Sequence, residues 1–154
     1  MSRKIQPVSG ATLARVEEAR VARLATLDAE SRPHIVPICF AYHDKLFYSA
    51  VDRKPKHVPA EKLARLRHIR RSPQVAMLID KYEEDWTQLW YILIRGKVKL
   101  IRDSAQKERG EAIRRLRAKY PQYAAGMFAD DAPLIWITPS RSLPGASSSL
   151  QAQY

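Results

Sequence analysis

Cysteine is nearly absent from this sequence, which contains one such residue, Cys39, among 154. A single cysteine excludes an internal disulfide, and its apolar neighbours favour a buried, inert thiol over a nucleophile. Long hydrophobic runs are also missing, because none approaches the roughly 20 residues of a membrane-spanning helix. The N-terminal segment lacks the apolar core of a secretion signal. We therefore expect a soluble, cytoplasmic protein that does not insert into membranes.

Glycine is scarce as well, with 5 residues, and none of them belongs to a Walker loop or a Gly-x-Gly-x-x-Gly motif. A phosphate group must therefore be held by side chains and not by a glycine-rich backbone loop. The 4 histidines never pair at i, i+4, and no Cys-His spacing matches a zinc site, so we expect no metal. There is no Gly-x-Ser-x-Gly motif either. The pattern identifies no catalytic residue.

Negative charge is in short supply, since 16 Asp and Glu stand against 27 Lys and Arg, for a net charge of +11. A field of this sign attracts nucleic acid, anionic lipid or a phosphorylated cofactor, and the total charge alone cannot choose between them. Hydrophobic residues make up 45% of the chain, which is typical of a globular domain with a continuous core. The placement of the charges must indicate the partner.

The hydrophobic pattern predicts six strands and three helices. The first three strands follow one another without a helix between them, which argues against a doubly wound parallel sheet. We expect one mainly β domain over 1–140, a closed antiparallel barrel with helical decorations, and a tail at 141–154. The strands are expected at 23–27, 34–42, 46–51, 74–82, 89–101 and 132–141, and the helices at 11–21, 59–73 and 103–121.

Three positions within this pattern have a specific meaning. Pro37 cannot donate to a strand ladder, so part of its strand is expected at a sheet edge or in a bulge, with backbone open to a ligand. Gly96 is expected to mark a bulge or a sharp bend. The segment 43–45 is short enough for a tight hairpin.

The segment "AVDRKPKHV" carries the most informative cluster of charge. Arg53, Lys54 and Lys56 follow a predicted strand, and Pro55 stiffens the chain between them. Such side chains can hold a phosphate through charge-assisted hydrogen bonds. The alternative interpretation is an ordinary solvated basic turn. The basic helix at 59–73 extends the positive surface.

The chain from Ala22 to Ile101, and more weakly to Ile137, resembles a known superfamily. Four features carry the resemblance in series: the strand order, the "RPHIVPI" strand, the "AVDRKPK" turn and the "DWTQLWYI" segment. They resemble the split-barrel flavin-binding proteins named after pyridoxamine 5′-phosphate oxidase. More narrowly, they resemble the branch of enzymes that depend on the deazaflavin coenzyme F420. The resemblance implies a six-stranded antiparallel split barrel that forms a homodimer with two cofactor sites at the subunit interface.

The resemblance also implies which residues contact the body of the cofactor. The backbone around Val36, Pro37 and Ile38 would run along the tricyclic ring. Ser49 and Ala50 would face the ribityl chain. These contacts use backbone and small side chains, so composition alone does not indicate them.

The remaining implied contacts lie at the two ends of the cofactor. Arg53, Lys54 and Lys56 would hold the phosphate. Trp90 and Tyr91 stand where pyridoxamine phosphate oxidases carry an Arg-Gln pair that contacts the ring from the second subunit. Because that pair is missing, ring recognition is expected to use stacking or backbone groups.

The sequence departs from true pyridoxamine phosphate oxidases at its C-terminal end. "PSRSLPGASSSLQAQY" lacks the tryptophan of the segment that grips flavin and substrate there. This argues against vitamin B6 oxidation and for an FMN- or F420-dependent oxidoreductase acting on another small molecule. The basic helix could follow the oligoglutamate tail of F420. Two alternatives remain: a flavin- or F420-binding protein without turnover, and a less favoured nucleic-acid-binding barrel.

Overall fold

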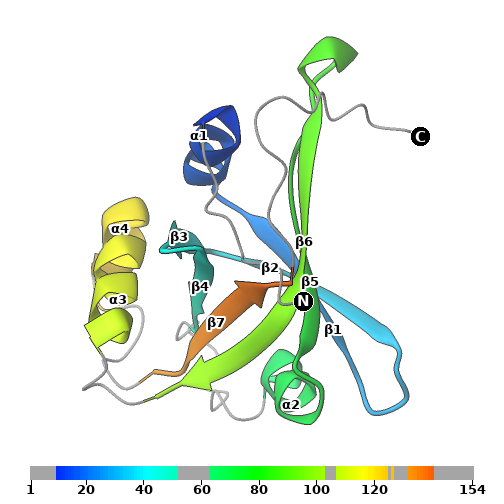
Figure 1. Cartoon of the computed structure of the whole chain (residues 1–154), viewed down its shortest axis with the longest axis vertical. Helices are drawn as coiled ribbons and strands as arrows, with labels where there is room; N and C mark the ends of the chain where they lie inside the picture. The colour runs from blue at the N-terminus through cyan, green and yellow to red at the C-terminus, as the bar shows by residue number, and fades with distance from the viewer. Residues whose placement is uncertain (1–9, 52–62, 103–106, 125, 127–131, 141–154) are drawn as a thin grey trace, which may run out of the picture.

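The computed structural model describes residues 10–51, 63–102, 107–124, 126 and 132–140. These form one antiparallel sheet of seven strands in the order β2-β1-β5-β6-β7-β4-β3 (Figure 1). The expected mainly β antiparallel architecture is therefore confirmed. The strands are β1 Ala22–Leu27, β2 Pro33–Ile38, β3 Ala41–His43, β4 Leu46–Ala50, β5 Gln74–Lys81, β6 Trp90–Ile101 and β7 Leu134–Pro139.

The helices lie close to their predicted places. They are α1 Gly10–Glu18, α2 Ala64–Arg71, α3 Lys107–Lys119 and α4 Pro121–Ala124, with a short 3-10 helix, η2, at Trp86–Gln88. Pro121, the last residue of the segment expected to hold the third helix, lies just beyond the end of α3. It also begins the short helix α4, where its fixed φ suits the first turn. No helix in the described ranges is long and apolar enough to cross a membrane.

The predicted second strand, 34–42, divides into β2 and β3 at Cys39 and Phe40, so the described sheet has seven strands and not six. The division has a tertiary cause, because the Phe40 amide donates to the Tyr120 hydroxyl, 3.0 Å away. β2 and β3 are the outermost strands of the sheet, yet two residues join them. Such a connection spans only about 10 Å. The two edges therefore come close at this corner, but β2 and β3 are not paired in the described sheet, so it curls into a half-barrel and not into the closed barrel expected.

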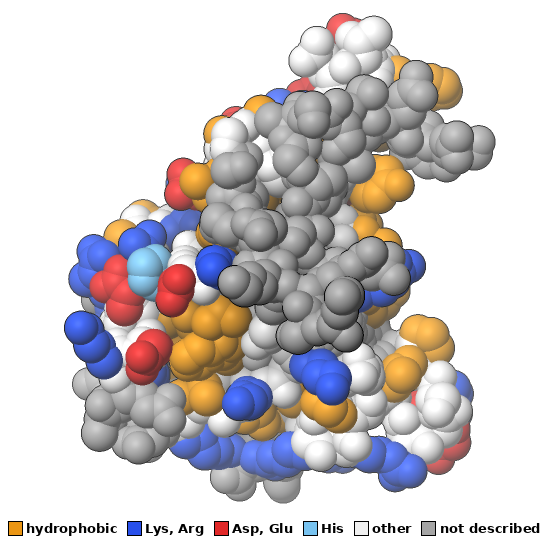
Figure 2. All heavy atoms as spheres, in the orientation of Figure 1, with side chains coloured by type: hydrophobic (Ala, Val, Ile, Leu, Met, Phe, Trp, Pro, Cys, Tyr) orange, Lys and Arg blue, Asp and Glu red, His pale blue; other side chains and the backbone are white. Residues whose placement is uncertain are grey.

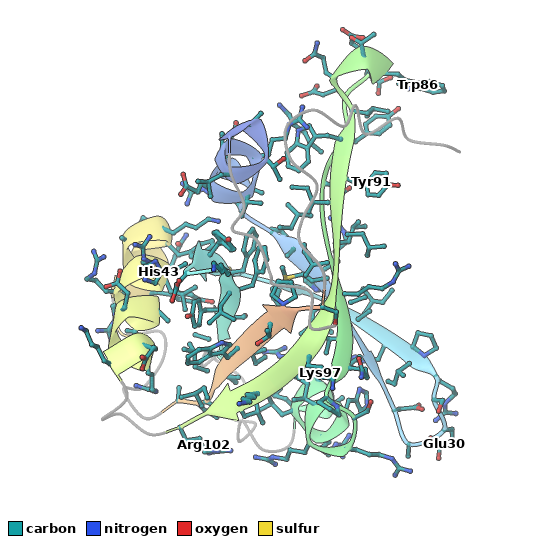
Figure 3. The ribbon with its side chains drawn as sticks, in the orientation of Figure 1. Glu30, His43, Trp86, Tyr91, Lys97 and Arg102 are labelled. Atoms are coloured by element: carbon teal, nitrogen blue, oxygen red, sulfur yellow. The ribbon has the colours of Figure 1, made fainter. Side chains whose placement is uncertain are left out.

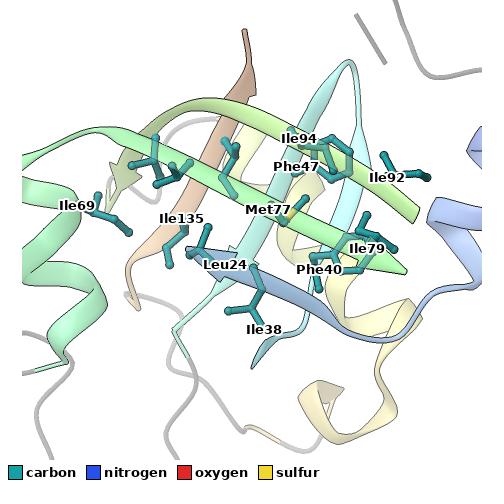
Figure 4. Packing of buried hydrophobic residues seen from close by; sticks show 14 of the residues in the cluster. Leu24, Ile38, Phe40, Phe47, Ile69, Met77, Ile79, Ile92, Ile94 and Ile135 are labelled. Atoms are coloured by element: carbon teal, nitrogen blue, oxygen red, sulfur yellow. The ribbon is translucent and has the colours of Figure 1, made fainter. Parts of the chain in front are cut away.

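Strand alternation builds the first core cluster inside this curl. In β6 the buried Ile92 and Ile94 alternate with the exposed Tyr91 and Leu93, as the two-residue period of a strand requires. Neighbouring strands contribute buried side chains to the same cluster. Figure 4 shows it, with Leu24, Ile38, Phe40, Phe47, Met77, Ile79 and Ile135 among its members.

A second core cluster lies on the outer face of the sheet, under α3. The helix contacts β3 and β4 and buries Ala112, Ile113 and Leu116 along one side. These side chains pack in one cluster with Tyr48 of β4 and Leu134 of β7. The sheet thus has an outer face covered by α3 at β3, β4 and β7, and a bare outer face, on which none of the described helices lies, at β1, β2, β5 and the first half of β6 (Figure 1).

The β3–β4 hairpin confirms the predicted tight turn. Its two-residue loop consists of Asp44 and Lys45, whose φ angles are 48° and 68°. Positive φ at both loop residues is the type I′ geometry, which matches the twist of the flanking strands. The turn places Asp44 at the tip of the hairpin, beside α3.

Gly96 lies in the middle of β6, a strand that bends along its length (Figure 1). The registers with β5 and β7 run through it without an extra residue, so the predicted bulge is absent. A Cβ on Gly96 would overlap the Thr138 carbonyl oxygen and would lie 3.0 Å from the carbonyl carbon. Glycine is required here because the β7 backbone approaches so closely.

Candidate functional site

β2 offers an open backbone edge. It stands at one end of the strand order and, among the described strands, pairs with β1 alone. The side chains of Val36 and Ile38 pack into or against the first core cluster, whereas Pro37 is exposed. The prediction that Pro37 lies in an edge strand is confirmed. An edge strand presents N–H and C=O groups with which a ligand beside it can form hydrogen bonds. Contact between the cofactor ring and the β2 backbone stays a prediction, and the edge position of β2 is suitable for it.

Ser49 and Ala50 lie deep in the sheet. Their exposed fractions are 2% and 5%, and β4 pairs them with Ile135 and Leu134 of β7. Their assignment to the ribityl chain stays a prediction, and it requires a ligand that reaches well below the surface.

The predicted phosphate-binding residues Arg53, Lys54 and Lys56 lie outside the described residues. The point at which their segment leaves the sheet is nevertheless defined. The Val51 amide donates to the Pro133 carbonyl oxygen at 3.2 Å, which continues the β4–β7 pairing by one step. Val51, the last described residue before that segment, therefore lies beside the start of β7.

A buried arginine lies at the same place, and the sequence pattern did not single it out. Arg109 of α3 is 3% exposed, and its Nη2 donates to the Ala132 carbonyl oxygen at 2.8 Å. Its Nε is buried and has no hydrogen-bond partner in the described part of the chain. Ala132 is adjacent to Pro133, which accepts from Val51, so a buried guanidinium stands near the start of the basic segment. Buried charges normally have partners, and an anion at this point would supply one.

Trp90 and Tyr91 occupy opposite faces of β6, as adjacent strand residues must. Trp90 is half-buried, and the Arg15 guanidinium lies 5.5 Å from its ring centroid. It borders a hollow of about 340 Å³, together with Arg23 and Asp80, which form an ion pair. Tyr91 is 38% exposed and projects from the other side of the strand (Figure 3). The two rings therefore do not form one stacking surface within a protomer.

The corner between β2 and β3 holds titratable groups with shifted pKa values. The Lys119 Nζ lies 3.9 Å from the Phe40 ring centroid and donates to the Val16 carbonyl oxygen at 3.3 Å. Burial, and then the Arg20 guanidinium, lower the pKa of Lys119 to about 8. Burial raises the pKa of Tyr120 to about 12, so its hydroxyl keeps its proton. No sequence signal indicates this corner, because its members come from distant segments.

Lys and Arg side chains gather along one edge of the molecule, at the bottom of Figure 2. α2 lies at this edge and buries Leu66 and Ile69 against the barrel. Its cations Arg67, Arg70 and Arg71 are exposed. They can therefore meet an anionic ligand or remain solvated. In the described part of the chain, no three His, Cys, Asp or Glu side chains are grouped to hold a metal ion.

Solved structures of similar shape include proteins named for different ligands. HutZ, the heme storage protein from Vibrio cholerae, has a TM-score of 0.69 and 15% identity, over 86% of this chain and 90% of HutZ. A structure named F420 reductase has a TM-score of 0.63 and 21% identity, over 86% of this chain and 95% of that one. A heme-binding protein from Mycobacterium smegmatis has a TM-score of 0.65 and 16% sequence identity, over 88% of this chain and 53% of that one. Structural similarity at such low sequence identity shows a shared fold and not a shared function.

Comparison of the sequence with protein-family models identifies the family of this chain. No curated protein sequence matches significantly. The family model described as pyridoxamine 5′-phosphate oxidase, in contrast, matches residues 9–143, which include every described strand. The curled antiparallel sheet agrees with that match, as does the likeness to the solved split barrels. The chain therefore belongs to the pyridoxamine 5′-phosphate oxidase family and has its split-barrel fold.

Proposed function

We propose that this protein is an oxidoreductase that binds FMN or the deazaflavin coenzyme F420 and reduces or oxidises a small organic molecule. The open edge of β2 is the observation that carries the proposal, because it can receive a planar ring along the backbone from Val36 to Ile38. The bound ring would supply the hydride chemistry, and the protein would supply binding and orientation. An obvious catalytic acid is therefore not required, because the cofactor ring would carry out the hydride transfer.

The phosphate end of the cofactor has a matching group in the structure. The orphaned Nε of Arg109 lies near the point where the segment with Arg53, Lys54 and Lys56 begins. A phosphate held by these three side chains at this place would also give the buried guanidinium a counter-charge. The net charge of +11 also favours a phosphorylated ligand, because a positive field attracts an anion.

A side-by-side titration of the purified protein tests the proposal. We expect FMN or F420 to bind, which changes the fluorescence of the bound ring, and we expect the pure protein to bind single-stranded DNA no more tightly than its charge requires. Heme serves as a third ligand because two proteins of similar shape are named for it. Binding of heme with neither redox cofactor would contradict the proposal. Cofactor binding without turnover of any substrate would favour the non-catalytic alternative.

The phosphate assignment is tested by changing Arg53, Lys54 and Lys56 together to alanine. We expect this variant to lose cofactor binding while the fold remains intact, because charge-assisted hydrogen bonds to a phosphate contribute strongly to affinity. Cofactor affinity from fluorescence titration and far-UV circular dichroism are the measurements.

A matched control removes the same charge from α2, by changing Arg67, Arg70 and Arg71 to alanine. All three are exposed. We expect this control to bind FMN as the unchanged protein does. If both triple variants lose the same affinity, the positive field as a whole acts on the cofactor and the local phosphate site is wrong.

We also propose that the protein is a homodimer. The bare outer face of β1, β2, β5 and β6 carries exposed apolar side chains, with Ile35 64%, Leu93 42% and Tyr91 38% exposed. The register places Leu93 beside Leu78, and Leu78 beside Arg23. A second copy offers the same mixed surface, and twofold symmetry lets identical patches cover each other. The open edge of β2 would then lie beside the subunit interface.

Replacing Leu93 by glutamate tests this arrangement. We expect the variant to be monomeric at concentrations at which the unchanged protein is a dimer, because the interface would bury an unpaired carboxylate. Light scattering coupled to size-exclusion chromatography measures the mass. Ala118→Glu places the same charge on the exposed side of α3 and is expected to leave the dimer intact. A dimeric Leu93→Glu protein would show that this face is not the interface.

A further inference from the structure

A cavity of about 520 Å³ lies between α3, the β3–β4 hairpin and β7. In Figure 2 it is the apolar hollow at the left, bordered by acidic side chains and one histidine. Its base is formed by Leu46, Tyr48 and Trp136, and its border includes Asp44 and Glu108. A volume of this size suits a small organic ligand. Neither the ring nor the phosphate assigned above uses any of these side chains.

The aromatic base is built by direct cross-strand pairing. Tyr48 of β4 is the register partner of Trp136 of β7, and their ring centroids are 5.3 Å apart with planes inclined by 59°. Trp136 is partly exposed to the cavity, so it offers a surface that a ligand can cover. Aromatic faces of this kind attract hydrocarbon and cations alike.

The Tyr48 hydroxyl points to a polar ligand group. Tyr48 is 1% exposed and lines the cavity, and within the described ranges no hydrogen bond joins its hydroxyl to another residue. A hydroxyl at the wall of a cavity can donate a hydrogen bond to a ligand or accept one from it. Burial, and then the negative charges of Asp44 and Glu108, raise the pKa of Tyr48 to about 12. The hydroxyl is therefore uncharged and lies in a negative potential.

The carboxylates at the border are not all neutralised. Glu111 is held by Arg114 and Arg115 at 2.7 Å. Asp44 and Glu108, in contrast, take part in no ion pair of the described residues. Asp44 is held at the hairpin tip by the type I′ turn, and Glu108 lies in the first turn of α3, where the helix dipole stabilises negative charge.

The cavity is thus locally acidic in a protein whose net charge is strongly positive. Among the described residues that line it, Lys107 is the one lysine or arginine, against three carboxylates. An anion would meet Asp44 and Glu108 without compensation. A cation would find both carboxylates and the lone pairs of the Tyr48 hydroxyl.

We propose that this cavity binds a small organic ammonium ion of the arylalkylamine class. The ammonium group lies between Asp44, Glu108 and the Tyr48 hydroxyl, and the hydrocarbon part covers Trp136 and Leu46. The inference is independent of the redox function, because none of the side chains assigned to the cofactor lines this cavity.

The probe is the 2-phenylethylammonium ion, titrated calorimetrically into the full-length protein, with 2-phenylethanol and phenylacetate as neutral and anionic analogues. We expect the ammonium ion to bind about tenfold more tightly than the alcohol, since a charge-assisted hydrogen bond contributes about 1.5–3 kcal/mol. We expect no binding of phenylacetate. Equal binding of ammonium ion and alcohol, preference for phenylacetate, or no binding of the ammonium ion would each overturn the proposal.

Two variants locate the site. Glu108→Gln and Tyr48→Phe are each expected to weaken binding of the ammonium ion by about five- to tenfold, because each removes one hydrogen-bonding group and keeps the packing. Glu30→Gln is the matched control, since Glu30 lies in the β1–β2 turn on the opposite side of the molecule from His43 (Figure 3). Thermal unfolding confirms that each variant is folded. Unchanged affinity in Glu108→Gln would place the ligand elsewhere and overturn the assignment.

Discussion

Replacing Gly96 by alanine is expected to lower the free energy of unfolding by roughly 3 kcal/mol, or to prevent folding. The added Cβ would overlap the Thr138 carbonyl oxygen, which belongs to the β7 backbone and not to a flexible side chain. β7 cannot retreat freely, because it pairs with β6 on one side and with β4 on the other. Urea unfolding followed by circular dichroism measures the change.

Gly110→Ala is the matched control for this substitution. Gly110 lies inside α3, and a Cβ there meets nothing within 4 Å. Alanine is favoured over glycine in a helix interior by about 0.5–1 kcal/mol, so we expect this variant to be slightly more stable than the unchanged protein. If Gly96→Ala unfolded at the same urea concentration as Gly110→Ala, the close approach of β6 and β7 would be refuted.

Tyr120→Phe is expected to lower the free energy of unfolding by about 2–3 kcal/mol. The hydroxyl accepts a hydrogen bond from the Phe40 amide, and it lies 3.0 Å from the carbonyl oxygens of Arg20 and Phe40, to which it can donate. Phe40 is fully buried, so its amide would be left without a partner. The same bonds fix the corner at which the two edges of the sheet meet.

Tyr82→Phe removes an equivalent hydroxyl from a residue that is 61% exposed. Surface substitutions of this kind change stability by less than about 0.5 kcal/mol. Thermal and urea unfolding of the two variants should therefore differ clearly. Equal stability of Tyr120→Phe and Tyr82→Phe would mean that the corner does not depend on this hydroxyl.

The two proposed ligands of this protein carry opposite charges. The redox cofactor would meet Arg53, Lys54, Lys56 and the buried Arg109, whereas the ammonium ion would meet the acidic cavity beneath α3. A net charge of +11 could suggest anionic ligands alone. The carboxylates around Tyr48, however, attract a cation locally, and this local attraction is the physical basis of the proposed cation site.

Local sequence patterns predicted most of the strands. The alternation of Ile92 and Ile94 with exposed neighbours, and the short loop at Asp44 and Lys45, depend on residues a few positions apart. Pro37 indicated an edge strand because proline lacks a donor in any surroundings. Such properties belong to the segment itself, so no distant contact is needed to infer them.

Contacts between distant segments account for what the sequence did not predict. The division of 34–42 depends on Tyr120, which is 80 residues from Phe40. The need for glycine at 96 is set by Thr138.

The sequence by itself determined the split-barrel class, the edge position of Pro37 and the match to the pyridoxamine 5′-phosphate oxidase family. Tertiary structure alone decided where the sheet edges come together, that Arg109 is buried with its Nε unpaired among the described residues, and that carboxylates from a hairpin and a helix share one cavity. The physical reason is the distance along the chain over which each effect acts. Propensity and periodicity act within a segment, whereas desolvation and the electrostatic potential at a site are set by every segment packed around it.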